Sequence, residues 1–161
     1  MPTYTIRRAC AEDRQSFINL SWAFTQFQAK SFGIPERLSE IMAPRQQQAV
    51  VRLDSQDDIH PVWLAHQGDR AIGYLTAEVY EPDAASENEA GPVGFIDEVF
   101  VVPEHRGGGI ATALMNTAIE WLNEQAIGRV VLHVYSRNEH ALQLYERMGF
   151  SVFALSLERQ L

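Results

Sequence analysis

Hydrophobic positions change their spacing several times along the chain, and each change predicts a new element. Alternating apolar positions predict strands, whereas apolar positions three and four residues apart predict helices. We expect strands at residues 4–8, 62–66, 71–80, 93–102, 129–135 and 151–160. We expect helices that begin at Glu12, Pro35 and Pro44, and two further helices over residues 108–126 and 139–148.

The order of these elements predicts a mixed α/β layer fold. Helices cluster early, a strand meander follows, and two strand–helix units precede the last strand. A chain of 161 residues with 46% hydrophobic residues is large enough to bury one core and has the composition of a globular protein. No internal repeat or low-complexity tract divides it, so we expect a single domain over residues 1–161.

Three consecutive glycines follow the strand predicted over residues 93–102. They are Gly107, Gly108 and Gly109, and an apolar stripe that starts at Ile110 marks the helix after them. The first N–H groups of a helix have no partner within it, and the helix dipole makes that end positive. Glycine lets a ligand approach without meeting a Cβ atom. The sequence therefore predicts a site for a phosphate or pyrophosphate at this corner.

Two common phosphate-binding motifs do not fit this stretch. A nucleoside-triphosphatase loop requires lysine and then Ser or Thr after its last glycine, where this chain has Ile110 and Ala111. A dinucleotide-binding fingerprint requires a third Gly or Ala where this chain has Thr112. That fingerprint also belongs to a first strand–helix unit, and this motif lies two-thirds of the way along the chain.

The pattern Arg106-x-x-Gly109-x-Ala111, preceded by alternating valines and a proline, resembles the acetyl-coenzyme A loop of the GCN5-related N-acetyltransferase (GNAT) family. That family's loop has Arg or Gln, two residues, Gly, one residue, and Gly or Ala. The segment from Asn138 through Tyr145 to Phe150 resembles the family's second cofactor block. The resemblance is good over residues 93–150 and loose in the N-terminal half.

The resemblance implies the fold and the cofactor. The fold is a GNAT-like acyl-CoA N-acyltransferase fold, with a central mixed, mostly antiparallel sheet of six to seven strands and four to five flanking helices. Acetyl-CoA is the implied co-substrate, with its pyrophosphate on the amides of the loop and its pantetheine arm along the preceding strand. The implied cofactor-binding residues are Val99, Phe100, Val101, Arg106, Gly107, Gly108, Gly109, Ile110, Ala111, Thr112 and Asn138.

Acetyl transfer to an amine sets the roles that catalytic side chains must fill. A base or a water chain takes the proton of the amine, and a donor supports the thiolate that leaves. By resemblance, Tyr145 is the candidate acid; the alternative is a core tyrosine on the helix face. Asp97 is the first candidate base and Glu98 the second, although an ordinary strand carboxylate is the competing interpretation. Side chains alternate along a strand, so both carboxylates reach one cleft only if a bulge redirects one, and Asp97 is expected to share a face with Val99.

Composition and charge exclude several other classes. The net charge of −8 argues against a nucleic-acid partner. The single cysteine, Cys10, excludes an internal disulfide and a multi-cysteine zinc site. The histidines have no metal-ligand spacing; His133 is expected in the core and His105 on the surface. No apolar run is long enough to span a bilayer, and the first residues do not resemble a signal peptide, so we expect a cytoplasmic protein without a membrane partner.

Negative charge is concentrated in one part of the chain. Residues 71–105 contain no Lys or Arg, but they contain Glu78, Glu81, Asp83, Glu87, Glu89, Asp97, Glu98 and Glu104. For Glu87 and Glu89 a solvated loop is the plainer interpretation. Glu78, Asp97 and Glu98 lie on predicted strands beside the proposed cofactor. For these three residues, the functional interpretation is an acidic field that attracts a cationic amine.

Three functions are compatible with these patterns. The first is N-acetylation of a primary amine on a small cationic molecule, by direct attack in a ternary complex. The second is N-acetylation of a protein or peptide, and the third is a non-catalytic acyl-CoA-binding regulatory module. Aromatic residues of the first helix and the loop after it are expected mainly in the core, with one or two lining the acceptor pocket; they are Trp22, Phe24, Phe27 and Phe32. Relatives in the family are often dimers, so a homodimer is also expected.

Overall fold

The computed structural model describes residues 3–33, 37–83 and 91–161. Its helices and strands, in chain order, are β1 (Thr5–Arg8), α1 (Arg14–Phe32), α2 (Leu38–Asp54), β2 (Val62–Gln67), β3 (Arg70–Tyr80), β4 (Val93–Val101), α3 (Ile110–Glu124), β5 (Val130–Leu132) and α4 (Glu139–Arg147). Short 3₁₀ turns, η1 (Ala11–Asp13) and η3 (Pro103–His105), precede α1 and follow β4. The helix start predicted at Pro35 and the acidic residues Glu87 and Glu89 lie outside the described residues.

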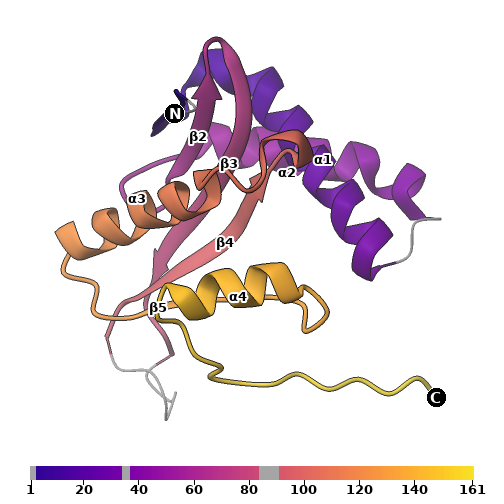
Figure 1. Cartoon of the computed structure of the whole chain (residues 1–161), viewed down its shortest axis with the longest axis vertical. Helices are drawn as coiled ribbons and strands as arrows, with labels where there is room; N and C mark the ends of the chain where they lie inside the picture. The colour runs from indigo at the N-terminus through magenta and orange to yellow at the C-terminus, as the bar shows by residue number, and fades with distance from the viewer. Residues whose placement is uncertain (1–2, 34–36, 84–90) are drawn as a thin grey trace.

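One sheet forms the centre of the molecule (Figure 1). Its order is β1-β2-β3-β4-β5; neighbouring strands are antiparallel from β1 to β4, and β5 is parallel to β4. The sheet is therefore mixed and mostly antiparallel, as expected. The described part of the chain forms five strands rather than the six to seven expected.

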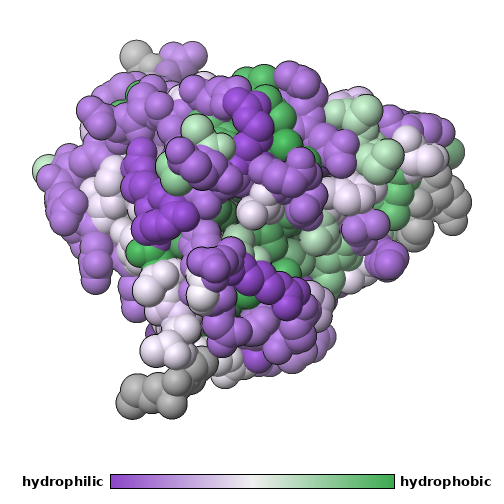
Figure 2. Space-filling view, turned by 90° about the horizontal axis from the view of Figure 1, so that it is seen from above, coloured by the Kyte–Doolittle hydropathy of each residue, from purple (hydrophilic) through white to green (hydrophobic). Residues whose placement is uncertain are grey.

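Helices cover both faces of the sheet and create two cores. On one face, Leu114 and Met115 of α3 and Tyr145 of α4 pack against sheet residues that include Leu75 and Ile96. On the other face, residues of α1 and α2 pack around the ring of Tyr74; the buried members are Ala9, Phe17, Leu20, Ala49, Leu53, Val62, Leu64, Tyr74 and Phe100. The outer surface is mostly hydrophilic, with hydrophobic residues gathered near the middle of the face shown in Figure 2.

The break that we expected at Pro44 does not occur. A single helix, α2, runs from Leu38 to Asp54 with Pro44 inside it. Proline removes one backbone donor, and with it the hydrogen bond to the residue four positions earlier. Ala49 and Leu53 of the same helix are buried against the sheet. Packing of this face therefore outweighs the local preference of proline.

The strand expected over residues 151–160 is also absent. Residues 151–161 are exposed and form neither a helix nor a strand. Figure 1 shows them as an extended trace that leads away from the end of α4. Apolar alternation alone does not make a strand, because a strand needs a neighbour that accepts and donates its backbone hydrogen bonds.

Candidate active site

β4 and β5 pair over only three residues and then separate. The paired positions run from Gly94 with Val130 to Ile96 with Leu132, and β4 continues to Val101 beside β3 alone. The strand expected over 129–135 is correspondingly short. β4 therefore has an edge beyond residue 96, on the side of β5, without a strand partner in the described chain.

The backbone groups on this edge belong to Val99 and Val101. The amide of Val102 donates to the carbonyl of Ile72, on the β3 side, at 3.0 Å. Because backbone groups alternate along a strand, those of Val99 and Val101 face away from β3. These are two of the three residues expected along the pantetheine arm. The third, Phe100, is paired with Tyr74 of β3, and its side chain is buried in the aromatic core.

The glycine loop leaves its backbone open at the start of α3. Gly107 and Gly109 have φ angles of 81° and 80°, in the left-handed region that favours glycine. A Cβ atom added at either position would meet nothing within 4 Å. Gly109 is the N-cap of α3, and no side chain caps this end. The amides of residues 110–112 therefore lack intrahelical partners, and the loop fits the pyrophosphate predicted for it.

Arg106 attaches this loop to the end of β4. Its Nε donates to the carbonyl of Val101 at 2.9 Å. Its guanidinium lies 4.6 Å from the ring centre of Phe27 and 5.5 Å from that of Phe100. Burial lowers the pKa of Arg106, but an arginine remains charged at neutral pH. Arg106 therefore connects the glycine loop with Phe27 of α1 and Phe100 of β4.

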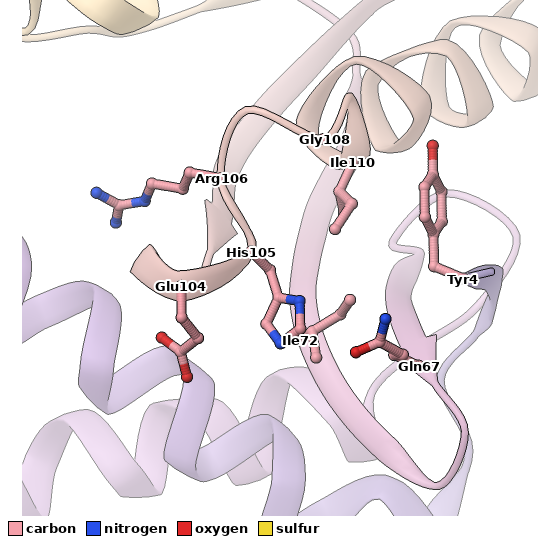
Figure 3. Close-up of a pocket in the computed structure, with 8 residues that line it drawn as sticks. All are labelled: Tyr4, Gln67, Ile72, Glu104, His105, Arg106, Gly108 and Ile110. Atoms are coloured by element: carbon pink, nitrogen blue, oxygen red, sulfur yellow. The ribbon is translucent and has the colours of Figure 1, made fainter. Parts of the chain in front are cut away.

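A small cavity lies on the other side of the loop (Figure 3). It has a volume of about 200 Å³ and is lined by Tyr4, Gln67, Ile72, Glu104, His105, Arg106, Gly108 and Ile110. In Figure 3 the guanidinium of Arg106 points away from the other lining side chains. Ligand pockets are usually about 300–1,000 Å³. This cavity is smaller, and none of its lining residues belongs to β4 or β5.

Tyr145 lies in the core between α4 and the sheet. The centres of its ring and of the Phe150 ring are 5.9 Å apart. Val99 of β4 packs against the same core cluster. Burial raises the pKa of Tyr145 to about 12. Among the described residues, none hydrogen-bonds to its hydroxyl group. The hydroxyl of Tyr145 thus carries its proton at neutral pH, and none of the described residues accepts a hydrogen bond from it.

Asn138, which the resemblance implies to be a cofactor-binding residue, caps α4. Its side-chain oxygen accepts a hydrogen bond from the amide of Ala141 at 3.3 Å. The other end of the helix stops at Gly149, which has a φ of 89°. These two caps fix the helix that carries Tyr145.

A bulge in β4 places both candidate carboxylates on one face. Thr76 of β3 pairs with Glu98, and the next residue, Ala77, pairs with Ile96, so Asp97 is the extra residue. Ile96 and Val99 both pack in the core beneath α3. The two residues between them therefore face α1 and α2. The expectation that Asp97 shares a face with Val99 and Val101 is wrong, because the bulge interrupts the alternation.

Glu98 is held by two partners. One of its oxygens accepts a 2.7 Å hydrogen bond from the hydroxyl of Tyr74, and the other forms an ion pair with Arg45 of α2. Its side chain is 13% exposed. Burial and the neighbouring Glu98 raise the pKa of Tyr74 well above its usual value. Burial alone lowers the pKa of Arg45, but Glu98 more than offsets it, so the net shift is upward. Both carboxylate oxygens of Glu98 are therefore bound by other side chains.

Asp97 has a different environment. It is exposed, and among the described residues it forms no hydrogen bond or ion pair. Its charge nevertheless helps to raise the pKa of Arg45. Asp97 is therefore the unpaired carboxylate of the two.

Arginines from other parts of the chain neutralise much of the acidic span. Arg52 of α2 lies 3.6 Å from Glu78, and Arg70 lies 2.7 Å from Glu104. With Glu98 bound to Arg45, two of the three strand carboxylates expected to form an acidic field are paired. In the described part of the span, the argument for attraction of a cation thus depends mainly on Asp97.

The histidines differ from expectation. His133 is exposed rather than part of the core, because β5 ends at Leu132 and the chain leaves the sheet there. Its ring contacts that of Phe95 at 5.3 Å. His105 is half-buried and lines the small cavity. Among the described residues, no group of three or more His, Cys, Asp or Glu side chains could hold a metal ion.

Sequence reasoning missed the two residues that hold Glu98. Arg45 lies 53 positions before Glu98, and Tyr74 lies 24 positions before it. Nothing in the local pattern connects either residue with a carboxylate. The aromatic residues of the first helix were identified, and the structure places Phe24 and Phe27 around Phe100 while Phe32 stacks on Tyr135 at 5.2 Å.

Comparison with known proteins agrees with this geometry. The model of the Acetyltransferase (GNAT) family matches residues 19–150. The chain is similar to a mycothiol acetyltransferase of Thermobispora bispora, with 33% identity over 89 aligned residues. This alignment covers 55% of this chain and 29% of that protein. They are 30% identical over 91 residues to a spermine/spermidine N(1)-acetyltransferase of Bacillus subtilis, covering 56% of this chain and 58% of that protein. Each alignment thus spans less than two thirds of the relative.

A solved structure shares the whole fold. A GCN5-related N-acetyltransferase from Ralstonia eutropha superimposes with a TM-score of 0.77 at 25% sequence identity. The superposition covers 98% of this chain and 99% of the other. No helix in the described part of this chain is long and apolar enough to cross a membrane.

Proposed function

Because this chain belongs to the GNAT acetyltransferase family, we propose that it transfers the acetyl group of acetyl-CoA to a primary amine. The observation that carries the proposal is the open loop from Gly107 to Gly109 at the start of α3, beside the unpaired edge of β4. The acceptor is a small cationic molecule, and residues 1–161 act as one domain. A cytoplasmic location is part of the proposal, since a chain with the single cysteine Cys10 uses no internal disulfide.

Acetyl-CoA, the acetyl donor of this family, supplies a thioester-bound acetyl group when it is bound. The amides of residues 107–112 bind its pyrophosphate. The backbone groups of Val99 and Val101 orient the arm that follows, as an added strand would. Arg106 supports this arrangement by holding the loop against the carbonyl of Val101.

The two proton transfers are assigned to Asp97 and Tyr145. A protonated amine cannot attack a carbonyl carbon, and the unpaired carboxylate of Asp97 accepts that proton, directly or through water. Tyr145 holds a proton on its hydroxyl oxygen, since its pKa of about 12 keeps it neutral. That proton is available to the departing thiolate. Glu98 is a structural partner of Arg45 in this assignment.

The preference for a small cationic acceptor has two supports. Asp97 is an exposed carboxylate on the face that α1 and α2 cover. The matched relative from Bacillus subtilis carries the name of a polyamine acetyltransferase. A homodimer is part of the same proposal.

Release of free thiol from acetyl-CoA tests the proposal. The purified chain is incubated with polyamines, aminosugars, amino acids and peptides, each with and without enzyme. Turnover with small amines is the expected result. Turnover with peptides alone would favour the protein N-acetyltransferase, and tight acetyl-CoA binding without turnover on any acceptor would favour the regulatory module.

A further inference from the structure

Two polar side chains lie at the position where β4 and β5 separate. Ile96 and Leu132 form the last pair of these strands, and the next residues are Asp97 on β4 and His133 after β5. Both side chains are exposed. The end of the strand pairing therefore brings a carboxylate and an imidazole to the same level of the sheet.

The two side chains also share a face of the sheet. Leu132 packs in the core beneath α3, so the next residue, His133, is directed to the opposite face. Its ring centre lies 5.3 Å from that of Phe95, which is the neighbour of the buried Ile96 and points away from that core. The bulge in β4 directs Asp97 to the same side. Asp97 and His133 thus both face the side of α1 and α2.

Neither side chain has a charged partner in the part of the chain that the structure describes. Asp97 and His133 form no hydrogen bond or ion pair there. The other charged groups that α1, α2, β3 and β4 bring to this side are two ion pairs and one lysine in the last turn of α1: Glu98 with Arg45, Glu78 with Arg52, and the exposed Lys30. The carboxylate of Asp97 is therefore the main charge near the imidazole.

This level of the sheet is also where the acetyl group belongs under the proposed function, on which the inference rests. A pyrophosphate bound at residues 107–112 leaves the arm to follow the free edge of β4 towards the point where β4 and β5 join. The opening closes at that point, so a group at the end of the arm is brought to Asp97 and His133. Tyr145 lies in the core on the other face. The proton donor and the two polar side chains therefore flank the opening from opposite faces.

An imidazole retains a proton better than a carboxylate does. A carboxylic acid ordinarily loses its proton near pH 4 and an imidazolium near pH 6.5, so the imidazole binds a proton about 10²–10³ times more tightly. Proton acceptors are most efficient when their pKa lies near the working pH. A proton that reaches an imidazole is thus less readily returned to an amine than a proton on a carboxylate.

We propose that His133 is a second proton-accepting residue of this site and receives, from Asp97, the proton of the acceptor's ammonium group. Asp97 takes that proton and leaves a neutral amine. It then passes the proton, directly or through water, to a ring nitrogen of His133, and its restored negative charge stabilises the imidazolium. His133 is exposed and returns the proton to solvent.

The other proton of the reaction moves on the opposite face. Tyr145 gives its hydroxyl proton to the sulfur as the C–S bond breaks. The nitrogen loses a second proton when the C–N bond has formed, and this proton restores the hydroxyl of Tyr145. One proton therefore leaves through His133 for each amine acetylated, and no further reactant is required.

The pH dependence of turnover tests the inference. In the wild type, kcat/KM with the best amine of the thiol-release panel is expected to fall between about pH 7 and pH 5, where histidine ordinarily becomes protonated. His133→Gln is expected to lower kcat at pH 7 by about 10²-fold and to lose this dependence. The matched control is His60→Gln: His60 precedes β2 and is bound to Asp57, and it is expected to behave as wild type.

A double variant tests whether the two residues move the same proton. His133→Gln combined with Asp97→Asn is expected to be no slower than the Asp97→Asn variant alone, because either change interrupts one path. Losses that multiply would show two independent roles and would overturn the inference. So would normal turnover of His133→Gln with the wild-type pH dependence.

Nuclear magnetic resonance tests the pair without turnover. Asp97→Asn is expected to shift the imidazole signals of His133, which are identified by their absence in His133→Gln. The signals of His60 should not move, because β3 lies between β2 and β4. Unchanged His133 signals would overturn the inference. A wild type that releases no thiol with any acceptor would instead contradict the proposed function, and the resonance comparison would still decide whether Asp97 and His133 form a pair.

Discussion

Two adjacent carboxylates on β4 have opposite surroundings. Glu98 is bound by Tyr74 and Arg45, whereas Asp97 is exposed and unpaired among the described residues. The sequence identified both residues but not the difference between them. That difference comes from a bulge and from an arginine on a distant helix.

Replacement of Asp97 by Asn is expected to lower kcat at neutral pH by about 10²-fold, because loss of a general base typically costs 10²–10⁴. The melting temperature should change little, since the side chain is exposed. Steady-state kinetics with the best acceptor, together with a thermal melt, measure both quantities. Full activity of Asp97→Asn would remove Asp97 from the mechanism.

Replacement of Glu98 by Gln is expected to destabilise the protein instead. It leaves Arg45 in a mostly buried position without its carboxylate, at a cost of about 1–3 kcal/mol in the free energy of unfolding. Urea unfolding of Glu98→Gln and wild type provides the measurement. If stability is unchanged and turnover is lost, then Glu98 rather than Asp97 is the base.

Tyr145→Phe is expected to reduce kcat by about 10²-fold with little effect on KM, because it removes the proton donor and retains the packed ring. Since burial raises the pKa of Tyr145 to about 12, the activity of the wild type should not decline through ionisation of this residue below pH 11 or so. Tyr4→Phe, at the small cavity, is the control and should behave as wild type. A variant with normal turnover would show that Tyr145 serves only the core.

At the scale of elements, the loop between β4 and α3 has the structure that its sequence predicts. The helix was expected from residue 108 and begins at Ile110, since Gly109 in a left-handed conformation is its N-cap. The position of the loop can be predicted from neighbouring residues alone, because glycine permits the turn and the apolar stripe after it specifies the helix.

Gly109→Glu is expected to weaken acetyl-CoA binding by about 10²-fold or more, because a carboxylate then lies beside the pyrophosphate. The left-handed φ also adds a cost of about 1–2 kcal/mol for any side chain. Gly68→Glu is a matched control: Gly68 has a φ of 59° and equally open surroundings in the β2–β3 turn. Calorimetric titration should show normal affinity for this control, and equal loss in both variants would contradict the loop assignment.

Two other elements show where local patterns were insufficient. Pro44 was expected to break a helix, but the buried face of α2 continues past it. Residues 151–161 have the alternation of a strand, but they pair with no strand in the part of the chain that the structure describes. In both cases the outcome depends on contacts with another element rather than on the segment itself.

At the scale of the molecule, Asp13 joins the start of α1 to β1 and β2. It accepts hydrogen bonds from Arg7 at 2.7 and 2.9 Å and from the amide of Cys10 at 2.9 Å, and it lies 3.4 Å from His66. Burial raises the pKa of Asp13, but these donors more than offset it, so its pKa lies well below the usual range. The folded state therefore favours the charged form of Asp13.

This preference makes the free energy of unfolding decrease as the pH falls into the acid range. A carboxyl with a depressed pKa in the folded state contributes its full stabilisation above its unfolded pKa, near 4, and loses it as the pH falls further. Asp13→Asn should cost about 1–3 kcal/mol at pH 7, and the difference from wild type should shrink towards pH 2. Urea unfolding at pH 7, 4.5 and 2.5 measures this, with the exposed Asp69→Asn as the control. A difference that is constant over this range would contradict the assignment.

The sequence by itself determined the order of most strands and helices, the glycine loop and the helix that carries Tyr145, whereas the mixed sheet was implied by the resemblance to the GNAT family. These features depend on periodicity, glycine conformation and capping, which act over a few residues. Only the tertiary structure decided which of the two carboxylates is exposed, that β4 and β5 separate after three pairs, that α2 passes through Pro44, and that residues 151–161 pair with no strand among the described residues. Each of these depends on groups that lie far apart in the chain and meet only when the sheet and its helices assemble.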